Sequence, residues 1–237
     1  MAHRFSRSLD HVLGPEETWR PRYGLVLFLT VATCLYMSLA PSAQWASSVA
    51  VLLQAATMLA ALRTVGKRTI AARFAALGVM MLAAAAIAIF FAADTGSLDT
   101  RTTGTSLLIA ALFVAFLPAL IALGVWRDIR RRGTIGVQSL LGTMSIYLLI
   151  GILFAFIYGS IAAVDPGAFY TDGTEGGIRS HIYFSFVTLT TLGYGDLTPA
   201  LAVGRTLAIS EALIGQIYLV TIIGVVVGQL GWRERSS

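Results

Sequence analysis

The run Thr188–Asp196 carries the residues best suited to chemistry, because two glycines there flank a tyrosine behind a stretch of threonines. Backbone carbonyl oxygens can replace the water shell of a cation when successive residues all point them toward one axis. That arrangement requires the backbone to alternate in handedness, and Gly193 and Gly195 accept positive φ at little cost. The Tyr194 ring between them can pack outward and hold the loop open. If the loop took this form, the Thr191 hydroxyl and the carbonyls of Thr191, Leu192, Gly193 and Tyr194 would line the path.

The elements that must position this run belong to a membrane protein. Hydrophobic residues make up 57% of the 237-residue chain and charged residues only 12%, which is far from the composition of soluble proteins. We expect an all-α membrane protein with six transmembrane helices, since several apolar runs approach the roughly 20 residues that cross a bilayer. A shorter helix at Ile178–Thr191 is expected to enter the membrane and stop midway. The six spans are expected at about Tyr23–Leu39, Trp45–Leu62, Ile70–Ala93, Ser106–Trp126, Val137–Val164 and Leu201–Gly231.

The distribution of basic residues orients this bundle. They cluster before the first span, between the second and third, between the fourth and fifth, and after the sixth. The opposite loops carry only Arg101, Arg179 and Arg205. Because positive loops stay cytoplasmic, we expect both termini inside the cell and the Gly-Tyr-Gly loop outside, in a multi-pass protein of the cell (inner) membrane. The bases are spread over separate short segments, which argues against a nucleic-acid interface.

The segment Thr191-Leu-Gly-Tyr-Gly-Asp196 resembles the selectivity filter of the tetrameric potassium channel family. Gly204-Arg205 is similar to the start of that family's inner helix, and Gly215 lies at the offset of its hinge glycine. The resemblance covers about Val137–Leu230 and implies a homotetramer that conducts potassium ions passively through the bilayer. It assigns ion binding to Thr191, Leu192, Gly193, Tyr194 and Gly195, and the outer mouth to Asp196.

Two positions depart from the family pattern. Leu192 stands where many members have Val or Ile, which changes the packing behind the filter. Val187 stands where some bacterial channels carry a buried Glu, so a Glu-to-Asp contact behind the filter is impossible here. We expect the Tyr183 hydroxyl to donate a hydrogen bond to Asp196 instead and to support the mouth.

Four further residues are singled out, and three of them each allow two interpretations. Gly215 is either a gating hinge or a site of close helix packing. Glu211 either lines a cavity and attracts cations, or hydrogen-bonds the short helix from behind in a protonated form. His181 either tunes the outer mouth near neutral pH or is a solvent-facing loop histidine, and the second is preferred. For Gln216, interhelical hydrogen bonding is expected.

The chain is expected to divide into a cytoplasmic segment 1–22, a four-helix unit 23–133 and a pore domain 134–232. The four-helix unit resembles a voltage sensor in number and orientation of spans but not in chemistry. Leu107–Val125 contains no charge and is interrupted by Pro118, whereas a sensor needs regularly spaced arginines. The basic cluster Arg127–Arg132 is interpreted as an interfacial anchor or linker. Weak or absent voltage gating follows.

Other functional classes find little support in the sequence. Cys34 is the single cysteine, which excludes an intrachain disulfide and a thiolate metal cluster. We expect no enzyme activity, no cofactor other than the permeant potassium ion, and no attached nucleotide domain. Two rival functions stay open: a potassium-transporter subunit with a potassium-type loop, and a non-conducting membrane scaffold or sensor.

Overall fold

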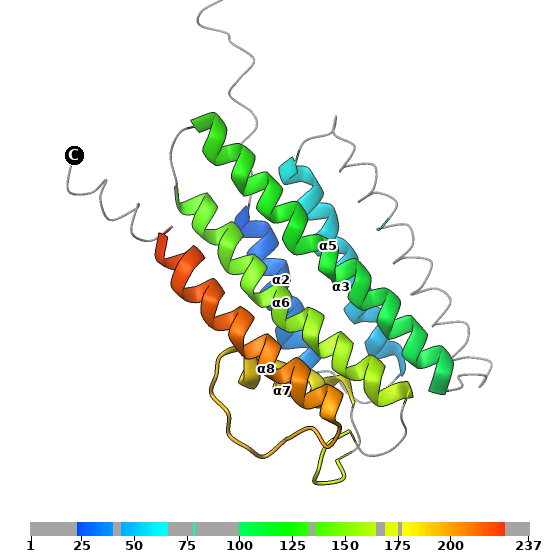
Figure 1. Ribbon diagram of the computed structural model, residues 1–237. Helices are drawn as coiled ribbons and strands as arrows, with labels where there is room; N and C mark the ends of the chain where they lie inside the picture. The colour runs from blue at the N-terminus through cyan, green and yellow to red at the C-terminus, as the bar shows by residue number, and fades with distance from the viewer. Residues whose placement is uncertain are drawn as a thin grey trace, which may run out of the picture.

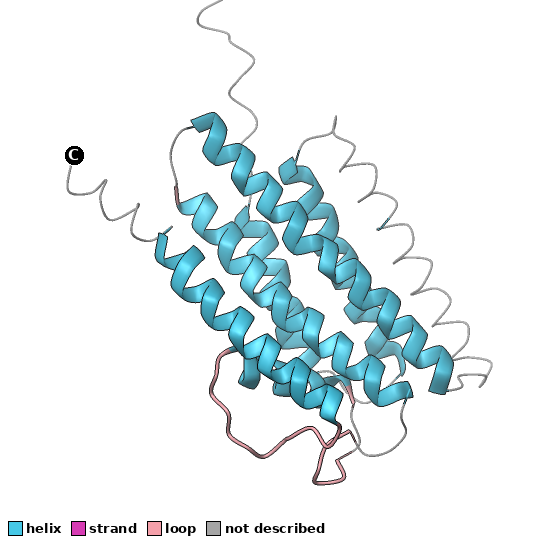
Figure 2. Ribbon diagram, viewed as in Figure 1, coloured by secondary structure: helices cyan, strands magenta, loops and turns pink. Residues whose placement is uncertain are grey.

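The computed structural model describes residues 23–39, 44–65, 78, 100–132, 136–164, 169–174 and 177–225, and it shows a bundle of long helices with one short helix at its end (Figure 1). These parts of the chain are helices and loops (Figure 2), with a single isolated β-bridge between Tyr170 and Pro199. The helices are α2 (Tyr23–Leu39), α3 (Gln44–Val65), α5 (Thr100–Arg132), α6 (Val137–Val164), α7 (Ile178–Leu189) and α8 (Ala202–Ile217), which continues as the π-helix η1 (Tyr218–Ile223).

The described helices occupy the expected first, second, fourth and fifth spans and the start of the sixth. Two segments, Val137–Val164 and Ala202–Ile223, are long and apolar enough to cross a membrane, and shorter apolar stretches occur in α2, α3 and α5. The expected third span, 70–93, lies outside the described residues except for Gly78. The segments 1–22 and 226–231 also lie outside them.

Helix α5 corrects two expectations about the fourth span. Pro118 lies inside the helix and does not interrupt it. The cluster Arg127–Arg132 is not a linker, because α5 continues to Arg132 before α6 begins at Val137. The Arg130 guanidinium lies over the Trp126 ring at 4.7 Å from its centroid, a cation–π contact suited to an interfacial anchor.

The described helices of the N-terminal half share one hydrophobic core with α6 and α7. The core includes Val26 of α2, Met58 of α3, Leu117 of α5, Leu149 of α6 and Ile182 of α7, all buried. Helix α6 is the centre of this packing, since it contacts α2, α5, α7 and α8 (Figure 1).

A glycine explains how closely α5 and α2 approach α6. A Cβ added at Gly142 would lie 2.7 Å from Val125 Cγ2 and 3.2 Å from the Tyr23 ring. The start of α2 is also tied to α6 by a hydrogen bond from Tyr23 N to Gln138 Oε1 (3.1 Å). Helices α2 and α5 therefore pack directly onto α6.

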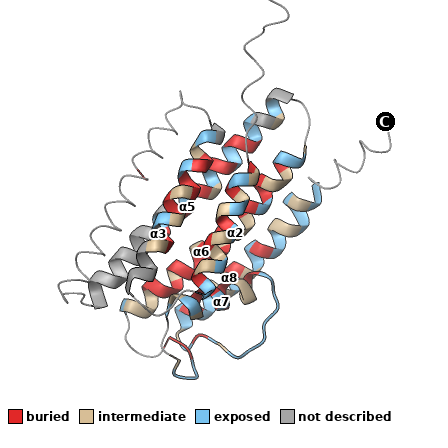
Figure 3. Ribbon diagram, turned by 180° about the vertical axis from the view of Figure 1, so that it is seen from behind, coloured by how far each residue is buried: buried red, intermediate tan, exposed pale blue. Residues whose placement is uncertain are grey.

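Helix α8 contacts the rest of the chain through one narrow stripe. Its buried residues are Gly204, Glu211 and Gly215, which share one side of the helix. The remaining faces expose large apolar side chains, as the pale blue along α8 in Figure 3 shows. These exposed residues include Val203, Ile209, Leu213, Ile217 and Val220.

Candidate functional site

The short helix α7 forms the base of the candidate site. It begins after Gly177, whose extended backbone (φ −79°, ψ 164°) serves as the N-cap, and it ends at Leu189. One face is buried against α6 and α8, and its members are His181, Ile182, Phe184, Ser185 and Leu189. This amphipathic spacing fixes which side of α7 turns inward and leaves the opposite side for the loop that follows.

The loop after α7 folds back over the C-terminal end of the helix. Val187 O accepts hydrogen bonds from Leu192 N (2.9 Å) and Gly193 N (3.4 Å), and Thr188 O accepts one from Thr191 N (2.9 Å). Carbonyls at a helix end otherwise have no partner in the chain. The loop is therefore held to α7 from behind by its own backbone N–H groups.

Backbone handedness along the loop matches the expected alternation. Gly193 (φ +57°) and Gly195 (φ +82°) lie in the left-handed region, and Leu192 and Tyr194 do not. Thr191 also has positive φ (+55°), and it is the one described non-glycine residue with this backbone conformation. Alternate residues in the left-handed region turn successive carbonyls toward one side, which is the geometry that a carbonyl-lined ion path needs.

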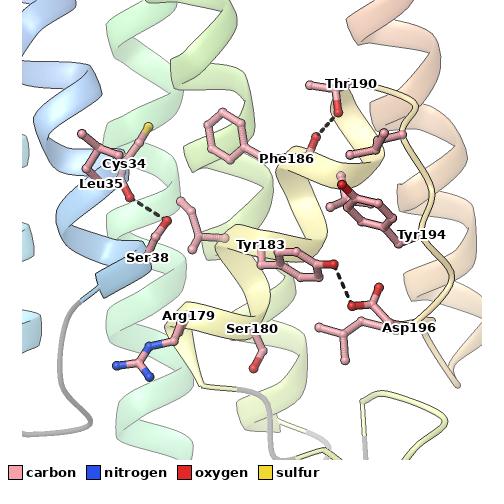
Figure 4. Close-up of a pocket in the computed structure, with 14 residues that line it drawn as sticks. Cys34, Leu35, Ser38, Arg179, Ser180, Tyr183, Phe186, Thr190, Tyr194 and Asp196 are labelled. Atoms are coloured by element: carbon pink, nitrogen blue, oxygen red, sulfur yellow. Dashed lines mark hydrogen bonds between the residues drawn. The ribbon is translucent and has the colours of Figure 1, made fainter.

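The outer end of the loop is held by the hydrogen bond that the sequence suggested. The Tyr183 hydroxyl donates to Asp196 Oδ2 at 2.7 Å, as Figure 4 shows. This bond holds the pKa of Asp196 below its usual range. A cleft of about 770 Å³ surrounds the pair and extends to Cys34 and Leu35 of α2, with Tyr194 on its loop side (Figure 4).

The preference for a solvent-facing His181 is wrong. Its side chain is 1% exposed, in the first turns of α7. Tyr170 and Phe169 fold back from the preceding loop and cover it, with the Phe169 ring edge-on at 5.6 Å and the Tyr170 hydroxyl 2.9 Å from Nδ1. A sequence shows the polar, glycine-bearing loop but not that its two aromatic residues pack inward.

The same aromatic turn fixes the segment after the loop. Ala200 N donates to Phe169 O (2.8 Å), and Thr171 N donates to Thr198 O (2.9 Å). The hydroxyls of Thr171 and Thr198 are 2.6 Å apart. Both ends of the filter-like loop are therefore fixed, one by α7 and one by this pairing.

Glu211 lies behind α7 and takes the second of its two expected placements. Its side chain is 0% exposed, so it does not line an open cavity. Tyr158 of α6 donates its hydroxyl to Glu211 Oε2 (2.7 Å), and Ser185 of α7 lies 2.5 Å from Oε1. The carboxyl thus joins α6, α7 and α8.

The count of protons favours a neutral Glu211. The Ser185 hydroxyl carries one proton and also lies 2.7 Å from Gly151 O, an atom that can only accept. If Ser185 donates to Gly151, the contact with Glu211 is a hydrogen bond only when the carboxyl donates to Ser185. A neutral acid in this position also avoids the cost of a buried charge without a cationic partner.

Gly215 allows α8 to approach the end of α7. A Cβ there would lie 2.5 Å from Leu189 O, an atom of the backbone. The same carbonyl accepts a hydrogen bond from the Tyr147 hydroxyl at 3.2 Å. Gly215 is therefore a site of close packing in this structure, and its hinge role stays a prediction.

Sequence reasoning did not find the partner of Gln216. Its Nε2 donates to Thr191 Oγ1 at 3.0 Å, which links α8 to the first residue of the loop. Residues 191–196 are all exposed in the single chain.

Comparison with known proteins agrees with this geometry over part of the chain. Residues 146–231 match the family model described as "Ion channel". Protein LctB of Bacillus caldotenax is 38% identical over 78 residues, which cover 30% of this chain and 57% of that protein. The chain thus spans little more than half of the length of this relative. No solved structure matches the chain. Over this segment the chain is therefore similar to an ion-channel domain.

Replacement of Gly215 by alanine tests the close approach of α8 to α7. Because a Cβ would meet backbone rather than a movable side chain, we expect Gly215→Ala to lower the free energy of unfolding by about 1–3 kcal/mol. The control is Gly24→Ala, where the nearest atom, Leu141 Cδ1, is 3.6 Å away. Thermal unfolding in detergent checks this, and equal midpoints for the two variants would contradict it.

Substitutions at Glu211 test the proton count. Gln can donate to Ser185 and accept from Tyr158, so we expect Glu211→Gln to unfold near the wild-type temperature. Glu211→Ala leaves the buried Tyr158 hydroxyl without its acceptor and should cost about 1–3 kcal/mol. Tyr158→Phe in the Glu211→Ala background should recover part of that loss. A Glu211→Gln variant as unstable as Glu211→Ala would mean that the carboxyl is charged.

Removal of the Tyr183 hydroxyl tests the support of Asp196. Because its pKa is lowered, Asp196 stays ionised down to a lower pH than a free aspartate. The stabilisation from the Tyr183 hydrogen bond is lost only when the pH falls through this lowered pKa. In Tyr183→Phe the Asp196 pKa should rise toward that of a free aspartate, so acid inhibition of ion flux should begin at higher pH than in wild type. Tyr218→Phe is the control. The Tyr218 hydroxyl, at the start of η1, donates a 2.7 Å hydrogen bond to Thr143 O of α6, away from Asp196. Superimposable acid titrations of Tyr183→Phe and wild type would argue against the support.

Proposed function

We propose that this protein is a potassium-selective channel that conducts K⁺ passively through the loop Thr191–Asp196. The observation that supports this best is the alternation of backbone handedness at Thr191, Gly193 and Gly195, directly after a helix that stops inside the bundle. Such a backbone can offer a row of carbonyl oxygens to a dehydrated ion. The ion-channel match over residues 146–231 supports the same function independently.

In this proposal the ion meets oxygens in a fixed order. The hydroxyl and carbonyl of Thr191 would form the inner site, and the carbonyls of Leu192, Gly193 and Tyr194 would form the next ones. Gly195 supplies the last turn, and Asp196 sets the outer mouth with the help of Tyr183. The proposed role of Val187 is indirect, since its carbonyl holds the N–H groups of Leu192 and Gly193. Conduction needs no covalent step, because ions repel one another along a row of sites.

A homotetramer is part of the proposal. One chain supplies one strand of carbonyls, and a closed ring of four strands surrounds the ion on every side. The exposed loop and the apolar faces of α8 in Figure 3 support this, because they are the surfaces that four copies around one axis would bring together. Large exposed apolar faces mark interaction surfaces or lipid contact.

The N-terminal helices are proposed as a scaffold for the pore and not as a voltage sensor. The apolar stretch of α5 carries no charge, because Arg101 lies in its first turn and the other arginines lie in its last turns. Moving charge through the field is the source of voltage dependence. We further propose that both termini are cytoplasmic and that the loop after α7 faces outward, as the basic residues indicate.

Ion flux from proteoliposomes tests the function. We expect wild type to carry K⁺ flux that follows the potassium gradient, with Na⁺ flux at least about tenfold lower. Gly193→Ala should lose this selectivity, because alanine is strained at φ +57°. Gly173→Ala is a matched control, since Gly173 has φ +77° in open space on the outer loop and should keep selective flux.

The alternatives give different results in this experiment. Equal K⁺ and Na⁺ flux would keep a pore but reject potassium selectivity, with Leu192 as the residue to replace by Val first. No flux under voltage, pH or membrane tension would favour the scaffold or transporter-subunit function. Native mass spectrometry of the purified protein should show four copies, and a monomer would contradict the ring of carbonyls.

A further inference from the structure

Thr191 has an unfavourable backbone conformation, and its side-chain hydroxyl makes two hydrogen bonds. A β-branched residue is rarely found at φ +55°, where glycine is the residue of least cost. Glycine stands at the other two left-handed positions, Gly193 and Gly195, but not here. The difference between threonine and glycine at this site is the side chain, so the hydroxyl is the group that offsets the strain.

The bonds of the Thr191 hydroxyl leave one lone pair free. Its proton is donated to Thr190 O at 2.7 Å. One lone pair accepts the Gln216 Nε2 hydrogen bond at 3.0 Å. A hydroxyl oxygen has two lone pairs, so a single one is left for a further ligand. Because the proton is already donated, the amide of Gln216 must present its N–H side and not its oxygen.

Close packing brings Gln216 within reach of the loop. Its neighbour Gly215 lets α8 approach Leu189 O, where a Cβ would meet that oxygen at 2.5 Å. Leu189 ends α7, and Thr191 follows two residues later. The amide of Gln216 therefore extends from α8 to the inner end of the loop, just before the π-helix begins at Tyr218.

We propose that Gln216 is a positioning residue for the inner cation site: its amide holds the Thr191 hydroxyl so that the remaining lone pair faces the ion path. This inference rests on the proposed conduction through the loop. Without the amide the hydroxyl can rotate about χ1 or turn its proton toward the path, where it would repel a cation. The affinity of the inner site for a dehydrated cation then falls, while the backbone carbonyls stay in place.

Barium provides the probe, because Ba²⁺ has nearly the radius of K⁺ and twice its charge. It should bind the same oxygens more tightly and block K⁺ current from the η1 side of the bilayer. In Gln216→Met we expect the blocking concentration to rise about fivefold to tenfold, since one hydrogen bond of about 1 kcal/mol is lost and 1.4 kcal/mol corresponds to tenfold. Gln216→Asn should raise the blocking concentration in the same way, because the shorter side chain cannot bring its amide to the Thr191 hydroxyl. This variant replaces Gln216→Met in the experiment if Gln216→Met does not fold.

A double-mutant cycle separates positioning from general stability. In a Thr191→Ala background, Gln216→Met should change the block no further, because the hydroxyl that it positions is absent. Thr221→Val is the matched control: it removes a hydroxyl one turn further along the same helix that donates to Ile217 O, and it should leave the block unchanged. Additive effects of Thr191→Ala and Gln216→Met, or equal block in wild type and Gln216→Met, would overturn the inference.

A second readout does not depend on conduction. Added Ba²⁺ should raise the unfolding temperature of the detergent-solubilised wild-type assembly, and it should do so less in Gln216→Met than in Thr221→Val. Wild-type liposomes without K⁺ flux would overturn the proposed function. Selective wild-type flux with the same Ba²⁺ dependence in Gln216→Met would overturn only the role of Gln216.

Discussion

The buried carboxyl of Glu211 holds the two halves of the candidate pore together. Helix α8 contacts its own chain through Gly204, Glu211 and Gly215 alone among its fully buried residues. The two glycines permit approach, but glycine offers no side chain to bind. Of these three residues, only Glu211 makes side-chain hydrogen bonds, to Tyr158 on α6 and Ser185 on α7.

A polar contact is well suited to this position because the hydrophobic effect contributes little to helix association inside a membrane. Apolar side chains gain little by leaving lipid for one another, so close packing and hydrogen bonds determine which helices associate. A neutral acid can donate and accept at once, whereas a carboxylate would leave its charge buried without a cation. With a neutral Glu211, three hydrogen bonds form in series: Tyr158 donates to Glu211, Glu211 donates to Ser185, and Ser185 donates to Gly151 O. The position of α7, and with it the loop, thus depends on one buried side chain.

The loop itself is fixed by hydrogen bonds at both ends, while residues 191–196 stay exposed. Backbone N–H groups bind it to Val187, Tyr183 holds Asp196, and the turn at Phe169 binds the segment that follows. Each of these contacts lies on α7 or on the outer loop, away from the exposed carbonyl side. Rigid support with free carbonyls is what a site needs if it must replace water around an ion without collapsing.

The sequence was sufficient where a feature is local. Hydrophobic runs predicted α2 and α6 to the residue, and the need for positive φ predicted Gly193 and Gly195. The sequence was not sufficient where the burial or the partner of a residue depends on segments that are distant along the chain. The burial of His181 depends on two aromatic residues that fold back from the outer loop. Composition marks that loop as polar and exposed, so no local pattern reveals the packing.

Long-range pairing also explains what was missed around Thr191. A threonine after a helix is ordinarily assigned to a turn with negative φ, and only the contact with Gln216 shows what its hydroxyl does. That contact joins residues 25 positions apart, and it requires the close approach at Gly215. Likewise Pro118 was expected to interrupt a span, but α5 packs into the core on either side of it, with Leu117 and Ile121 fully buried, and the helix continues through the proline.

The connection between the two halves limits how a stimulus could reach the loop. Helix α5 ends at Arg132 and α6 begins at Val137, so the N-terminal helices pack against the pore helices of their own chain. Helix α2 contacts both α6 and α7, and its Cys34 and Leu35 line the cleft beside Tyr183 and Asp196. A displacement of α2 would therefore act on the Tyr183–Asp196 pair within the same chain. It would need no moving charge, which agrees with the uncharged apolar stretch of α5.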